Sequence, residues 1–90
     1  MTDTEKIVKI NEMVETYCTS WNGNMKAALK NAMKAIVYVK TDVPEAADAE
    51  SYQAYIGVLA ILTFMEDSFF LSEHQSSKLS DFAADLHYSW

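Results

Sequence analysis

Two pairs of carboxylates are the residues in this 90-residue chain whose types and spacing are best suited to chemistry. Glu12 and Glu15 lie three positions apart, and so do Glu45 and Asp48. Side chains at this spacing share one face of a helix, and carboxylate oxygens are the hard ligands that Mg²⁺ takes in proteins. Two such pairs on different helices could hold a magnesium ion that assists hydrolysis.

The arrangement resembles that of the all-α nucleotide pyrophosphohydrolases. The resemblance implies a metal-dependent nucleotide hydrolase that uses Glu12, Glu15, Glu45 and Asp48. Two features depart from that pattern. Glu45 follows Pro44 at an expected helix start, and all seven basic residues are lysines, so no arginine is present to clamp a phosphate. We therefore expect a protein that is not an enzyme and that needs no metal or cofactor.

The cysteine and the histidines do not form a catalytic or metal-binding set. Cys18 lies near the expected C-terminus of a helix, where the dipole disfavours a thiolate, so we expect a packing residue. A zinc site needs three or four ligands. His74 falls in a capping segment and His87 near the chain end, which is typical of ordinary surface or interface histidines.

Apolar residues at three-four spacing predict four main helices. The first runs from about residue 4 to 21 and begins with a capping box, Thr2 with Glu5. The second begins at Asn22 or Asn24, and the 41–45 segment is the midpoint of the chain. A second capping box, Ser72 with Gln75, precedes the last helix. We predict an all-α fold, a small four-helix bundle-like domain with short connecting loops that spans residues 1–90.

The third helix is the most apolar element. From about Tyr52 to Phe69, and most of all between Ile56 and Met65, apolar residues occur on every side. This pattern is typical of the central helix of a bundle or of a helix shared between subunits. Gly57 would allow a close helix crossing there.

Half of the residues are hydrophobic and only 22% are charged, a high apolar content for a chain that can bury about two thirds of its surface. We therefore expect most of the eleven aromatic residues to face the core, and we expect a homodimer. The predicted self-association surface consists of Tyr52, Tyr55, Ile56, Gly57, Leu59, Phe69 and Phe70. Tyr88 and Trp90 are predicted as a further aromatic contact, because such residues are favoured in interfaces.

The net charge of −6 is unevenly distributed. Residues 1–40 hold six lysines and four acids, a balance of +2, whereas residues 41–90 hold one lysine and nine acids, a balance of −8. The predicted partner-binding acidic face consists of Asp42, Glu45, Asp48, Glu50, Glu66, Asp67 and Glu73. It would meet a basic surface on another protein. Lys26, Lys30 and Lys34 form a stripe that is either a solvated edge or a contact for an acidic partner.

These observations favour a small acidic non-enzymatic protein that binds another protein and modulates it, by inhibition in the simplest case. Phage-encoded inhibitors and toxin-neutralising immunity proteins have this general composition. The alternatives are the metal-dependent nucleotide hydrolase and an acidic mimic that blocks a DNA-binding site. We expect no membrane partner, because the ten-residue run from Ile56 to Met65 is far below the ~20 residues that span a bilayer. A single cysteine and the lack of a visible export signal lead us to expect a cytoplasmic location. The acidic second half argues against direct nucleic-acid binding.

Overall fold

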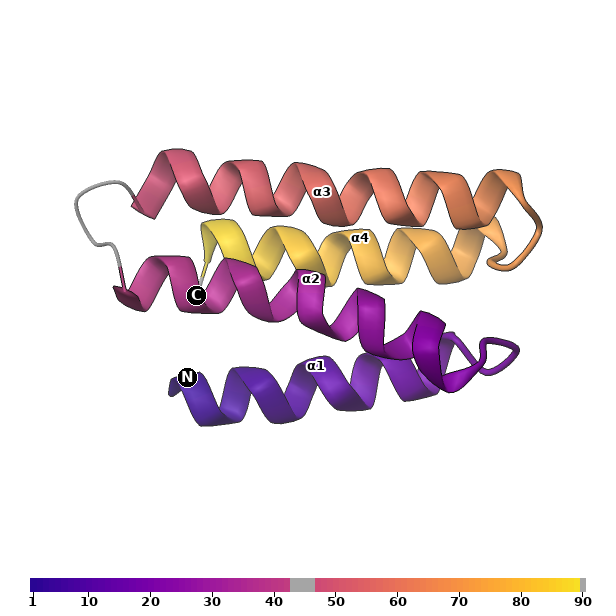
Figure 1. The fold of residues 1–90 in the computed structure, drawn as a ribbon, viewed down its shortest axis with the longest axis horizontal. Helices are drawn as coiled ribbons and strands as arrows, with labels where there is room; N and C mark the ends of the chain where they lie inside the picture. The colour runs from indigo at the N-terminus through magenta and orange to yellow at the C-terminus, as the bar shows by residue number, and fades with distance from the viewer. Residues whose placement is uncertain (43–46, 90) are drawn as a thin grey trace.

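The computed structural model describes residues 1–42 and 47–89, with the backbone alone for residues 41, 42 and 47. These residues form four helices: α1 Asp3–Tyr17, α2 Gly23–Asp42, α3 Ala47–Asp67 and α4 Glu73–Tyr88 (Figure 1). The described ranges contain no strand. The predicted all-α, four-helix bundle-like fold is confirmed.

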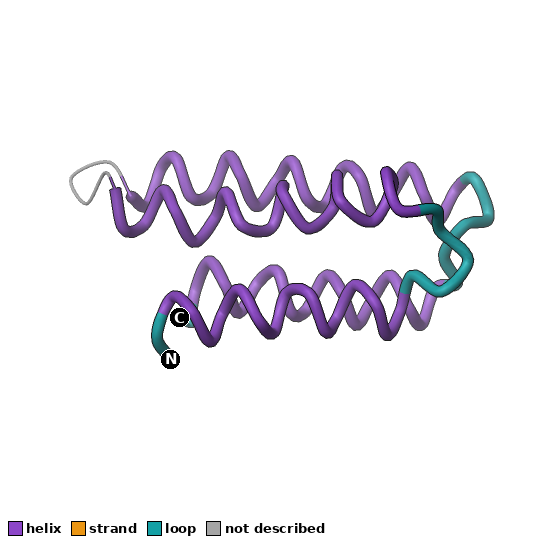
Figure 2. Tube along the Cα trace, turned by 60° about the horizontal axis from the view of Figure 1, so that its bottom comes forward, coloured by secondary structure: helices purple, strands orange, loops and turns teal. Residues whose placement is uncertain are grey.

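The helices run up and down in two layers, α2 beside α3 and α1 beside α4 (Figure 2). The bundle measures 38 × 22 × 21 Å. The segments 18–22 and 68–72 lie together at one end, which we call the loop end. The start of α1 and the end of α4 lie at the opposite end, the terminus end (Figure 1). Among the described residues α2 and α4 each contact all three other helices, whereas α1 and α3 do not touch.

The helix starts follow the sequence signals. The Glu5 backbone N–H donates to Thr2 Oγ1 at 3.2 Å, and the Gln75 backbone N–H donates to Ser72 Oγ at 3.1 Å. Asn22 caps α2, since its Oδ1 accepts the Met25 backbone N–H at 2.9 Å. Both predicted capping boxes are thus confirmed, and of the two predicted caps of α2, Asn22 and Asn24, the structure uses Asn22.

The first helix ends earlier than residue 21, where the apolar spacing placed its end. It stops at Tyr17 because Cys18 leaves helical geometry, with φ −107° and ψ 45°. Trp21 N–H then donates to the Cys18 carbonyl oxygen at 3.1 Å within the turn. The apolar side chain of Trp21 continues the stripe of α1 although its backbone belongs to the loop.

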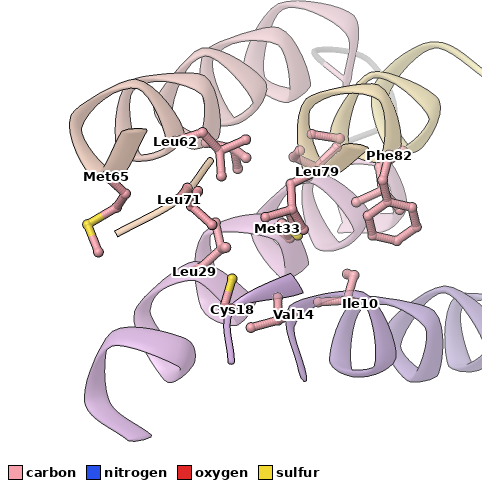
Figure 3. Close-up of a cluster of buried hydrophobic side chains, with 14 of the residues drawn as sticks. Ile10, Val14, Cys18, Leu29, Met33, Leu62, Met65, Leu71, Leu79 and Phe82 are labelled. Atoms are coloured by element: carbon pink, nitrogen blue, oxygen red, sulfur yellow. The ribbon is translucent and has the colours of Figure 1, made fainter. Parts of the chain in front are cut away.

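The core is formed by one apolar face of each helix and by residues of both loops (Figure 3). Its buried members are Ile10, Val14, Cys18, Trp21, Leu29, Met33, Ile36, Val37, Val58, Leu62, Met65, Leu71, Leu79, Phe82, Ala83 and Leu86. No helix in the described ranges is long and apolar enough to cross a membrane.

The expectations for the apolar residues are met only in part. No described helix is central: α2 and α4 each contact the three others, and α3, which contacts α2 and α4 alone, occupies a corner of the bundle with one face in solvent. As a result, most aromatic residues do not face the core: of those described, only Trp21 and Phe82 are buried. Gly57 is exposed, and a Cβ at its position would meet nothing within 4 Å, so none of the other described helices crosses there. A third helix shared between subunits stays a prediction.

Candidate interaction surface

An open pocket of about 350 Å³ lies at the loop end, between the first half of α2 and the last half of α3. Its lining consists of Trp21, Met25, Ala28, Ile61, Phe64, Met65 and Phe70. The two helices draw apart toward this end of the bundle (Figure 1). In the close-up, Met65 and Leu29 mark the α3 and α2 sides of the core beside it (Figure 3). The sequence pattern did not predict the pocket, because its lining comes from four separate segments.

Trp21 is the buried, hydrogen-bonded member of the pocket lining. It is 5% exposed, and its indole Nε1–H donates to the Phe70 carbonyl oxygen at 3.0 Å. This bond joins the two loops of the loop end, and the Ser20 hydroxyl donates to the same oxygen at 3.5 Å. The one side-chain N–H among the lining residues is therefore already satisfied. The side chains that line the pocket therefore offer a bound group apolar contact rather than hydrogen bonds.

Phe69 stands beside this pocket in an unusual backbone conformation. It is 96% exposed and has a φ of 65°, in the left-handed region. Phe70 N–H donates to Met65 O at 2.8 Å and Phe69 N–H to Glu66 O at 3.1 Å, the bond pair of a Schellman helix end. Glycine is the usual residue at this position, and another residue costs about 1 kcal/mol there. An exposed phenylalanine thus occupies a position where it weakens the fold.

The outer face of α3 continues the pocket along the bundle. Phe64, 68% exposed, belongs to both, and Tyr52 and Ile56 are exposed further toward the terminus end. No charged residue occurs between Ser51 and Met65, although this stretch includes the solvent face of the helix. We call Tyr52, Ile56, Gly57, Ala60, Thr63 and Phe64 the α3 face; all six are exposed.

The predicted self-association residues are only partly on this surface. Tyr52, Ile56, Gly57, Phe69 and Phe70 are exposed, while Tyr55 and Leu59 are half-buried. Because α3 is a corner helix, residues at the edge of its outer face pack partly against neighbouring helices. Self-association itself stays a prediction.

The predicted acidic face is split between the two ends of α3. Asp48 and Glu50 are exposed in its first turn, Asp67 is exposed and Glu66 half-buried in its last turn, and exposed Glu73 begins α4. None of these five forms an ion pair with another described residue. Asp42 and Glu45 belong to the predicted face as well, but the Asp42 side chain and the whole of Glu45 lie outside the described residues.

The terminus end carries a second aromatic cluster. His87 stacks on Tyr55 with ring centroids 5.6 Å apart, and Tyr52 and Tyr88 contact the same pair of rings. His87 Nδ1 and the hydroxyl of buried Ser51 share a hydrogen bond of 2.6 Å. Burial, with Tyr88 and Tyr52 acting in the same direction, raises the pKa of the Tyr55 hydroxyl.

Sequence reasoning treated His87 as an ordinary surface or interface residue and did not consider Ser51. One signal was present: Ser51 continues the core positions Val58, Leu62 and Met65 one helical repeat earlier, and a polar residue on a core face needs a partner. Tyr88 is exposed, as a contact residue must be. Trp90, the other predicted member of that contact, lies outside the described residues.

Lys40 holds the end of α4 in place. Its Nζ donates to the carbonyl oxygens of Leu86 and His87 at 3.2 and 2.9 Å. A cation at these carbonyls satisfies acceptors that have no partner within the helix. Burial, and then repulsion from Lys6, lowers the pKa of Lys40. This contact and the Ser51–His87 bond tie the end of α4 to α2 and α3.

The described members of the carboxylate pairs, Glu12, Glu15 and Asp48, do not come together as the alternative of a metal-dependent hydrolase requires. Lys26 and Lys30 donate to the two oxygens of Glu15 at 2.9 and 2.8 Å, which connects α1 to α2. Hydrogen bonds from Lys30 and then Lys26 hold the pKa of the Glu15 carboxyl below its ordinary value. Asp48 lies on α3, which α1 does not touch, and Glu45 is outside the described ranges. The described residues contain no group of three or more side chains that could hold a metal.

Two of the three stripe lysines therefore have a structural role, as the ion pairs with Glu15 show. Cys18 is 1% exposed within the core, as expected for a packing residue. Burial raises the pKa of its thiol to about 11, so the reactive thiolate is disfavoured.

Comparison with protein-family models, curated protein sequences and solved structures finds no match for this chain. The geometry of the surface is therefore the basis on which a function can be proposed for this chain.

Proposed function

We propose that this protein is a non-enzymatic helical module that binds another protein through the loop-end pocket and the adjoining α3 face, and modulates that protein by occupying part of its surface. The observation that carries the proposal is the pocket itself. Its volume is about 350 Å³ and all seven lining side chains are apolar or aromatic. A cavity of about 150 Å³ holds a benzene ring, so the pocket has room for a bulky side chain of a partner.

The surroundings of the pocket support a protein partner over a small molecule. Sites for small molecules place a few polar groups that orient the ligand, whereas the indole N–H of Trp21 is bonded to Phe70. Three exposed phenylalanines, Phe64, Phe69 and Phe70, add apolar area next to the pocket. Aromatic residues of this kind are enriched in the centres of protein interfaces.

Two neighbouring alanines of α2 provide the test. Ala28 lines the pocket and Ala27 does not, and both are exposed. Ala28→Phe would fill the pocket from its wall, whereas Ala27→Phe adds the same ring to the outer surface. Circular dichroism and urea unfolding would verify that both variants fold.

The wild type and the two variants would serve as baits for affinity capture from cells of the natural host, followed by mass spectrometry. We expect a protein that the wild type and Ala27→Phe retain in equal amounts and that Ala28→Phe loses by at least tenfold. If every captured protein binds all three baits equally, the pocket is not the binding site and the proposal is wrong.

A further inference from the structure

The charge pattern of α3 identifies the kind of partner that its outer face fits, and this step rests on the proposed function. The α3 face has an uncharged centre with acids at both ends: Asp48 and Glu50 before Ser51, Glu66 and Asp67 after Met65. The exposed acids Glu50 and Asp67 are seventeen positions apart, which corresponds to about 26 Å along a helix. A partner that lies along the face must match both the apolar centre and the charged ends.

A second copy of the chain does not match this pattern. Twofold symmetric pairing of α3 with α3 is either antiparallel or parallel. In the antiparallel case the first-turn acids meet Glu66 and Asp67 of the other copy, and in the parallel case each acidic end meets itself. Like charges that face each other across an interface oppose association. The predicted homodimer would therefore be destabilised at both ends of its contact.

We propose that the α3 face and the loop-end pocket bind an amphipathic helix of another protein that has an apolar stripe and basic residues at both ends. The two basic ends are about 26 Å apart, four to five helical turns. The apolar stripe covers Tyr52, Ile56 and Phe64, and its largest side chain enters the pocket near Ile61 and Met65. This occupant complements both the uncharged centre and the unpaired acids.

Two synthetic helical peptides of about 20 residues test the inference. Both carry the same apolar stripe. One has two lysines at each end where the other has two glutamates, with the two ends about seventeen positions apart. In the wild type we expect the lysine peptide to bind at least tenfold more tightly in 20 mM salt by calorimetry. The preference should shrink in 200 mM salt, because exposed charges are then screened.

The effect of the acids at the end of α3 on peptide binding has to be distinguished from the effect of the net charge of −6. The double variant Glu66→Lys/Asp67→Lys should lose most of the preference for the lysine peptide. Glu12→Lys/Asp85→Lys makes the same change in net charge at exposed positions of α1 and α4 and should retain it. An equal loss in the two double variants overturns the inference.

The remaining outcomes separate this inference from the proposed function. Equal binding of the two peptides overturns the basic partner and leaves apolar docking in place. If neither peptide binds, the inference that the partner is a helix is wrong. The comparison of Ala28→Phe with the wild type in affinity capture then tests the proposed function independently. A stable dimer at micromolar concentration by sedimentation, abolished by Phe64→Ala, would assign the face to a second copy and also overturn the inference.

Discussion

The two ends of the bundle both collect aromatic rings, and they use them in opposite ways. At the terminus end, Tyr52, Tyr55, His87 and Tyr88 contact one another, and the polar atoms of His87 and Ser51 bond together. At the loop end, only Trp21 is buried and bonded, while Phe64, Phe69 and Phe70 remain exposed around or beside an open pocket. The first arrangement joins the start of α3 to the end of α4, with Tyr52 and Tyr88 still partly exposed, whereas the second leaves apolar rings in solvent with few contacts in the fold.

This difference separates rings that stabilise the fold from rings that do not. A ring that is buried and hydrogen-bonded loses contacts when it is truncated, whereas an exposed ring loses almost none. Stability measurements can therefore assign each aromatic residue to one class. Residues whose removal leaves the fold intact are candidates for binding.

The largest effect is expected for Trp21→Ala. The side chain is buried and its indole joins the two loops, so we expect the free energy of unfolding to fall by about 3–5 kcal/mol. Urea unfolding monitored by circular dichroism would measure this loss. Phe64→Ala, in the same pocket but 68% exposed, should change stability by less than about 1 kcal/mol. Equal losses in the two variants would mean that the pocket is part of the core.

A smaller effect is expected at the terminus end for His87→Ala. This change removes the stacking on Tyr55 and leaves the buried Ser51 hydroxyl without its partner, at a cost of about 1–3 kcal/mol. Ser51→Ala alone should cost less, and the double variant should cost less than the sum of the two. A coupling of about 1 kcal/mol in the double-mutant cycle would establish the bond. Strict additivity would argue that the two groups do not interact.

The fold was predictable because each helix carries its own local signals. The capping residues Thr2, Asn22 and Ser72 and the three-four apolar spacing depend only on neighbours in sequence, and the structure agrees with them. The end of α1 was misplaced because Trp21 satisfies the apolar spacing from a loop. Apolar spacing predicts which side chains are buried, but it does not show whether the backbone at each of these positions is helical.

The candidate surface was predictable only in part. The sequence indicates that α3 is too apolar for one buried face, but not whether it lies at the centre or at a corner of the bundle. That choice depends on how the four helices pack, and it decides that Ile56 and Phe64 are exposed. The pocket depends on the divergence of α2 from α3 and on the Trp21–Phe70 bond, which joins residues 49 positions apart. No local pattern contains that information.

A third prediction concerns the conformation of Phe69. Phe69→Gly should raise the free energy of unfolding by about 0.5–1 kcal/mol, because glycine adopts the left-handed conformation without strain. Phe69→Ala keeps the strain and should be close to neutral, since the ring is 96% exposed. Thermal unfolding of both variants would check these values. If Phe69→Gly is destabilising, the ring contributes to the fold and its exposure does not indicate a binding role.

The smallest effect concerns the charges, which are paired between α1 and α2 and unpaired at the ends of α3. The pKa of Glu15 is lowered by Lys30 and Lys26, so its pairing contributes stability above the ordinary pKa of 4.5 and loses it as the pH falls through the lower folded-state value. Wild type and Glu15→Gln should therefore differ in urea midpoint at pH 7 and converge below pH 4. Glu12→Gln, which alters an exposed carboxylate one turn earlier on α1, is the matched control and should match the wild type at both pH values. A difference between wild type and Glu15→Gln that persisted at low pH would mean that the two lysines stabilise α1 through packing rather than through charge. Glu15 would then differ from the acids of α3 only in the area of its contact with neighbouring side chains, and not in an ion pair that stabilises the fold.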